Sequence, residues 1–138
     1  MSTLAAVNLK NPSSATNNVV LATNGDLQFN SGYGSAATAY GCRAWVNFNG
    51  IGTVAIRASG NVSSITDNGT GTYTINLATA LTDTNYAVVT GAQNNSTNTN
   101  TATNIHQGAA PTTSAFRLEH VENSATADAS QLAVAVFR

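Results

Sequence analysis

The stretch from Gly41 to Arg57 constrains the fold most, because apolar and polar side chains alternate there more densely than anywhere else in the chain. One parity consists of Cys42, Ala44, Val46 and Phe48, and the other of Arg43, Trp45, Asn47 and Asn49. A period of two places successive side chains on opposite faces of a β-strand. We therefore expect a strand with one core face, in which Cys42 is a small buried hydrophobe, and one amphipathic face.

Trp45 dominates the amphipathic face and is the only tryptophan in the chain. Its ring can stack on Arg43 or Arg57, or lie under a neighbouring subunit. Nothing catalytic gathers near these three residues in the sequence. We interpret Arg43, Trp45 and Arg57 as a candidate subunit contact.

Composition supports an all-β fold with a neutral surface. Charged residues make up 8% of the 138 residues, and the formal net charge is −1. Asn, Thr and Ser together exceed a third of the chain, and such residues favour strands and turns over exposed helices. The absence of a basic patch excludes nucleic acid as an expected partner. No apolar segment approaches the length needed for membrane insertion, and no leader pattern is present, so we expect synthesis in a cytoplasm.

Turn signals divide the chain into an N-terminal region, residues 1–39, and a body, residues 40–138. In the first region, Val19–Leu21 and Leu27–Phe29 flank a tight-turn signal and predict a small β-hairpin on an extended arm. Residues 30–39 are rich in Gly, Ser and Ala, which fits either a flexible linker or an ordered surface loop.

The body contains about eight strand patterns separated by turn signals, which predicts an antiparallel β-sandwich of the jelly-roll-like kind. Strict alternation places Tyr73, Ile75 and Leu77 inward. Residues 78–84 form a connection for which one helical turn is an option. Residues 85–91 are apolar on both parities and predict a central strand. In the strand from residue 114 to 122, one face carries Phe116, Leu118 and His120.

The sequence contains no recognisable catalytic constellation. His120 shares its side of the strand only with Glu122, and two ligands make a poor metal site. Asp67, Asp83 and Asp128 lie in turn contexts that capping explains, so paired catalytic carboxylates are not indicated. We expect no enzymatic activity, no cofactor and no metal.

One loop is the candidate binding segment. Residues 93–103 are almost entirely Asn, Ser and Thr, and lack side chains able to form a core. The segment is therefore expected to be an exposed loop or edge ribbon. Its candidate binding residues are Asn94, Asn95, Thr97, Asn98 and Asn100.

An ordered series of motifs runs through the body, namely A-W-V-N-F-N-G from Ala44, G-T-V-A-I-R from Gly52, N-V-S-S-I-T-D-N-G-T-G from Asn61, Y-T-I-N-L from Tyr73 and N-Y-A-V-V from Asn85. This series resembles a module of tailed-bacteriophage virion proteins, many of them from cyanophages. The resemblance covers about residues 40–92 and, more weakly, the C-terminal strands. The early stretch from Asn11 to Leu21 also resembles segments of phage fibre proteins.

This resemblance implies a structural protein of the virion, and two roles stay open. In the first, a homotrimeric tail-fibre or receptor-binding component contacts host surface glycans through its loops. In the second, a capsid decoration (cement) protein contacts other virion proteins through residues 1–30. A glycan-active enzyme is a third reading, against which the lack of paired carboxylates argues.

Overall fold

The computed structural model describes residues 8–9, 12–13, 15, 19–30, 35–93 and 100–138. Every regular element in these residues is a β-strand, and all strand pairs are antiparallel. Nowhere in the described part of the chain is there a helix long and apolar enough to cross a membrane. The chain divides into two compact units, Met1–Tyr40 and Gly41–Arg138.

The first unit contains a small four-stranded meander. Its strands are β1 (Asn8–Leu9), β2 (Val19–Leu21), β3 (Leu27–Phe29) and β4 (Ala37–Thr38), in that spatial order. The predicted hairpin corresponds to β2 and β3. The segment predicted to be a linker or loop contains β4, which pairs with β3 through Gln28↔Thr38 and Phe29↔Ala37. Sequence analysis missed β4 because a two-residue strand carries no periodic signal.

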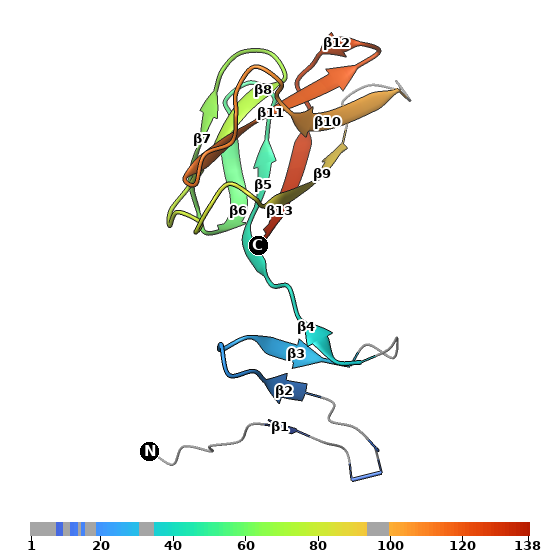
Figure 1. Ribbon diagram of the computed structural model, residues 1–138. Helices are drawn as coiled ribbons and strands as arrows, with labels where there is room; N and C mark the ends of the chain where they lie inside the picture. The colour runs from blue at the N-terminus through green and yellow to red at the C-terminus, as the bar shows by residue number, and fades with distance from the viewer. Residues whose placement is uncertain (1–7, 10–11, 14, 16–18, 31–34, 94–99) are drawn as a thin grey trace. The chain divides into compact units, whose positions relative to one another are not determined.

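The second unit consists of two sheets, shown in Figure 1. We name each after a central strand. The β13 sheet has the order β6 (Ala55–Gly60), β5 (Cys42–Asn49), β13 (Gln131–Phe137), β9 (Ala87–Gln93). The β11 sheet has the order β10 (Thr101–Ile105), β11 (Ala115–Glu122), β8 (Thr72–Leu77), β7 (Val62–Asp67), and the short β12 (Ala125–Thr126) also pairs with β11.

The chain crosses between the sheets several times. Strand β9 belongs to the β13 sheet, the next two strands β10 and β11 belong to the β11 sheet, and β13 then returns to pair with β9. At the corner between the sheets, the Thr90 hydroxyl donates to the Thr103 carbonyl oxygen over 2.8 Å. The prediction of an all-β antiparallel sandwich is confirmed.

The core lies between these two sheets and draws on both. Its buried residues are Ala44, Val46, Phe48, Val62, Tyr73, Ile75, Leu77, Leu81, Phe116, Leu118, Ala129, Leu132, Val134 and Val136. Phe48 of β5 meets Tyr73 of β8 edge-on, with ring centroids 5.3 Å apart. The inward parities predicted for β8 and β11 are confirmed, and His120 is fully buried among them.

Two details of the predicted body are wrong. Cys42 is exposed, because it is the first residue of β5 and lies beside a register shift between Val136 and Phe137 of β13. Strand β9 is an edge strand, although its run of apolar residues predicted a central one. Val89 on its outer side is 58% exposed, so the second apolar parity faces outward and no third layer covers it in the described chain.

Candidate functional site

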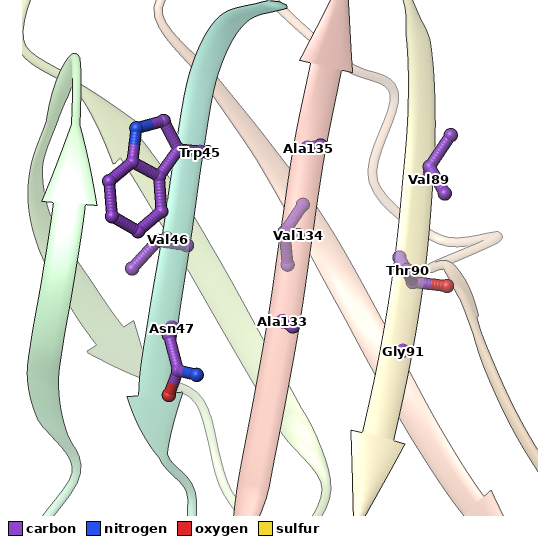
Figure 2. A pocket seen from close by; sticks show the side chains of 9 residues that line it. All are labelled: Trp45, Val46, Asn47, Val89, Thr90, Gly91, Ala133, Val134 and Ala135. Carbon is purple, nitrogen blue, oxygen red and sulfur yellow. The ribbon is translucent and has the colours of Figure 1, made fainter.

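The outer face of the β13 sheet carries a shallow apolar groove, shown in Figure 2. Its lining residues are Trp45, Val46, Asn47, Val89, Thr90, Gly91, Ala133, Val134 and Ala135, and its volume is about 390 Å³. These residues come from the adjacent strands β5, β13 and β9. The groove therefore runs along the middle of the sheet, where neighbouring side chains are set by strand pairing.

Strand register explains the shape of the groove. Trp45, Ala135 and Val89 form one row across the three strands, and Asn47, Ala133 and Gly91 form the next outward-facing row. The two alanines of β13 make the floor because a methyl group rises little above the sheet. In Figure 2, Trp45 and Val89 stand on opposite sides of Ala135.

The absence of a side chain at Gly60 leaves room for the Trp45 indole to lie on the sheet. The two residues are register partners on β5 and β6. A Cβ atom at position 60 would lie 2.5 Å from the indole Nε1 and 2.9 Å from Cδ1. The ring therefore occupies the space that a side chain of β6 would otherwise take. Trp45 stays 45% exposed in this position, with its outer surface open.

The other two residues predicted for a subunit contact lie on the same sheet. Arg43 is exposed, near the start of β5. The Arg57 guanidinium reaches from β6 to the residue directly before β13, where its Nη2 donates to the Ser130 carbonyl oxygen over 2.7 Å. Its Nη1 lies 3.5 Å from Gln131 Oε1. The β13 sheet thus carries Arg43, Trp45 and Arg57, with the two arginines away from the alanine floor.

The outer face of the β11 sheet has the opposite character. The Asn76 amide donates to Ser64 Oγ over 3.1 Å and to Thr66 Oγ1 over 3.0 Å. On the same face, Arg117 Nε donates to Thr74 Oγ1 over 3.3 Å. Hydroxyls, amides and a guanidinium here satisfy one another or water. The apolar outer face is therefore a property of the β13 sheet and not of the whole sandwich.

Most of the predicted loop residues lie outside the described residues, namely Asn94, Asn95, Thr97 and Asn98. Asn100 is described and exposed, directly before β10, and its carbonyl oxygen accepts a hydrogen bond from Asn123 N over 2.9 Å.

Buried polar groups at one end of the sandwich are used for structure. The Tyr73 hydroxyl lies 2.7 Å from Asp128 Oδ1 and 3.0 Å from the Gly50 carbonyl oxygen. Asp128 Oδ1 also accepts the Gly71 N–H over 2.7 Å. Burial, followed by the hydrogen bond to Asp128, raises the pKa of Tyr73 above its ordinary value. The hydroxyl therefore keeps its proton and joins three loops.

His120 belongs to a second buried polar contact. Its Nδ1 lies 2.8 Å from Thr103 Oγ1, and its Nε2 lies 3.7 Å from Glu122 Oε1. Within the described residues, no group of three His, Cys, Asp or Glu side chains is arranged to hold a metal ion. The pair with Glu122 is the one that the strand parity predicted.

Asp83 binds Arg138, the residue that directly follows β13. Arg138 forms a two-point ion pair with it, in which Nε donates to Asp83 Oδ1 over 2.8 Å and Nη2 contacts Oδ2. The hydrogen bonds from Arg138 and from the Asn85 N–H lower the pKa of Asp83. Asp67 Oδ1 caps its own turn by accepting the Gly69 N–H over 2.9 Å.

The sequence pattern identifies Trp45 as an outward-facing residue but does not identify the rest of the groove. Ala133 and Ala135 share the outward parity of β13, yet alanine at such positions is unremarkable until the neighbouring strands are known. Val89 belongs to an apolar run that predicts a central strand. Pairing β9 and β5 with opposite sides of β13 brings these residues together, and that pairing is not local.

No protein-family model matches the chain, and neither a curated protein nor a solved structure shows significant similarity to it.

Proposed function

We propose that this chain is a structural, non-enzymatic protein of a bacteriophage virion, of the tail-fibre or receptor-binding type. The observation that carries the proposal is the exposed apolar groove on one face of an otherwise polar sandwich. Single surface hydrophobes are ordinary, whereas several apolar side chains gathered on one face favour association with another surface. The likeness of the Trp45 and Tyr73 strands to phage modules supports the same role.

The use of the acidic groups also favours a structural role over catalysis. Asp67 caps a turn, Asp83 pairs with Arg138, and Asp128 binds Tyr73 and a backbone N–H. Each of these contacts stabilises a connection between strands. A hydrolase of glycans would instead need two carboxyl groups facing a common open space.

In this role, the chain acts as a homotrimer that presents its loops to host surface glycans. The connection between β9 and β10 is the candidate recognition segment, and Asn100 at its end is exposed. Amide and hydroxyl groups suit hydrogen bonding to sugars. Three linked copies raise the effective concentration, so that weak single sites give firm attachment.

A capsid decoration protein is the second candidate, and the first unit favours it. Register places Leu9, Val19, Phe29 and Ala37 in one row of the β1–β4 sheet, with Leu21 paired to Leu27 on the same side. The larger of these side chains are about half exposed. A single small sheet with an open apolar face is marginally stable alone and gains stability by covering another protein.

Locating the chain in phage particles tests the proposal. Antibodies against residues 41–138, detected with gold in electron micrographs, should label the tail tip or fibres if the first role holds. Uniform labelling of the head would support decoration. Absence of the chain from purified particles would refute both virion roles. Gel quantification against the major head protein gives an independent copy number, low for fibres and high for decoration.

A further inference from the structure

The β13 sheet presents both a protrusion and a recess on one face. Val89 on edge strand β9 is 58% exposed, and Trp45 on β5 is 45% exposed. Between them, Ala133 and Ala135 form the floor of the groove. The recess continues onto β9 at Gly91, which has no side chain and has open space where a Cβ atom would lie. The face therefore has raised apolar groups next to the kind of recess into which such groups pack.

The charge distribution on this face matches a protein interface. The outward residues on the described strands of the sheet include no carboxylate. On these described strands, the only charged side chains are Arg43, near the start of β5, and Arg57, whose guanidinium is bound at Ser130. Interfaces between proteins have an apolar centre and a polar rim in which arginine is common. A sugar is a poor match for the groove itself, because the floor offers methyl groups where a glycan needs hydrogen-bonding partners.

We propose that the groove is the contact surface for a second copy of this chain, with Val89 of one copy seated over Ala133 and Ala135 of the other. The contact adds a pairwise association between copies to the structural role proposed above, on which its biological meaning rests. Because the protrusion and the recess lie on the same face, one surface supplies both partners of the contact. This is the self-complementarity that associations between identical chains require.

The area of this face sets the expected strength of the association between two copies. Four strands spaced about 4.8 Å apart, with about seven residues each at about 3.3 Å per residue, cover on the order of 400 Å² per copy. A standard stable interface buries about 800 Å² per partner. The face alone therefore gives a reversible association that depends on concentration, and not an obligate oligomer.

Sedimentation velocity on the purified full-length chain tests the contact. We expect the wild-type chain to shift from the mass of one copy to that of two as its concentration rises toward about 1 mM, the range of weak complexes. Ala135→Glu puts a charge in the floor and should weaken association at least about tenfold. Ala115→Glu is the matched control, because Ala115 faces outward on the β11 sheet. It should associate like the wild type.

A second variant and a fluorescence measurement complete the test of the contact. Val89→Lys alters an exposed edge position that tolerates charge, so it tests the contact even if Ala135→Glu fails to fold. Trp45, as the only tryptophan, should shift its emission to the blue on association because its outer surface becomes covered. A wild-type chain that stays monomeric at the highest concentration overturns the contact, as does equal weakening by Ala115→Glu. Neither result depends on where the chain is found in particles, so failure of the virion role would be seen separately.

Discussion

The Tyr73 side chain combines a buried ring with a hydroxyl group that is hydrogen-bonded inside the fold. Its ring is buried against Phe48, and its hydroxyl is bound between Asp128 and the Gly50 carbonyl oxygen. Gly50 is fixed by the same contact, because a Cβ there would lie 2.6 Å from the Tyr73 hydroxyl oxygen. Core packing and loop attachment are thus joined in one side chain.

Removing this hydroxyl should destabilise the body. We expect Tyr73→Phe to lower the free energy of unfolding by about 1–3 kcal/mol, because Asp128 and Gly50 then lose a buried hydrogen-bond donor. Tyr86→Phe is the control, since its hydroxyl donates to the Thr112 carbonyl oxygen at an exposed site and should cost about 0.5–1 kcal/mol. Urea unfolding measures both. Equal losses in the two variants would contradict the role of the buried contact.

Gly60 offers a second test at the scale of one residue. Gly60→Ala places a Cβ in the space of the Trp45 indole, so the ring should rotate outward and its fluorescence emission should move to the red. Because the ring lies on the surface, the change in unfolding free energy should stay within about 1 kcal/mol. Gly91→Ala lies on the same face with open space around its Cβ and should leave the emission unchanged. An unshifted spectrum for Gly60→Ala would show that the indole does not rest on this glycine.

At the scale of elements, alternation predicted most strands of the body and their inward faces. Tyr73, Ile75 and Leu77 on β8 are inward as expected, since a one-residue slip would expose all three. The misassignment of β9 has a physical cause: its outward Val89 belongs to an apolar groove, and apolar residues on both parities also occur in a central strand. Sequence alone does not separate a face covered by the same chain from one left open.

The paired ends of β5 and β13 show a second feature that alternation in the sequence does not predict. The parity of Cys42 predicted burial, but a register shift beside Phe137 and the end of the strand leave the thiol exposed. The Cys42 thiol is 3.1 Å from the Ala44 carbonyl oxygen, to which it donates. Irregular pairing of this kind depends on the partner strand and has no local signature.

The ion pair at the end of β13 predicts a pH dependence. The pKa of Asp83 is lowered by the Arg138 hydrogen bonds, so the folded state holds the proton less tightly than the unfolded state. The stabilisation is therefore full above the unfolded-state pKa of about 4 and is lost as the pH falls through the lower folded-state value. Asp83→Asn should flatten this part of the acid unfolding curve. A curve unchanged by Asp83→Asn would contradict the coupling.

At the scale of the whole molecule, the two units differ in how they bury apolar surface. All buried hydrophobic residues in the described chain lie between Ala44 and Val136. In the first unit, Leu9, Leu21, Leu27 and Phe29 stay about half exposed. The sequence separated these regions through their turn signals. It did not reveal that the first unit forms a four-stranded sheet with one apolar face, because pairing between strands of two or three residues leaves no periodic trace.

This difference predicts that residues 41–138 fold without the first unit. Because the core is complete within the body, removal of residues 1–40 should change the free energy of unfolding by less than about 1 kcal/mol, and the urea dependence should change little. Trp45 fluorescence reports the transition in both chains, since Trp45 lies within the body. A peptide of residues 1–40 should show no cooperative unfolding, because a small single sheet does not bury enough apolar surface. A large loss of stability in the fragment would instead mean that the first unit completes the core, and the apolar face of its sheet would then serve the body and not a partner.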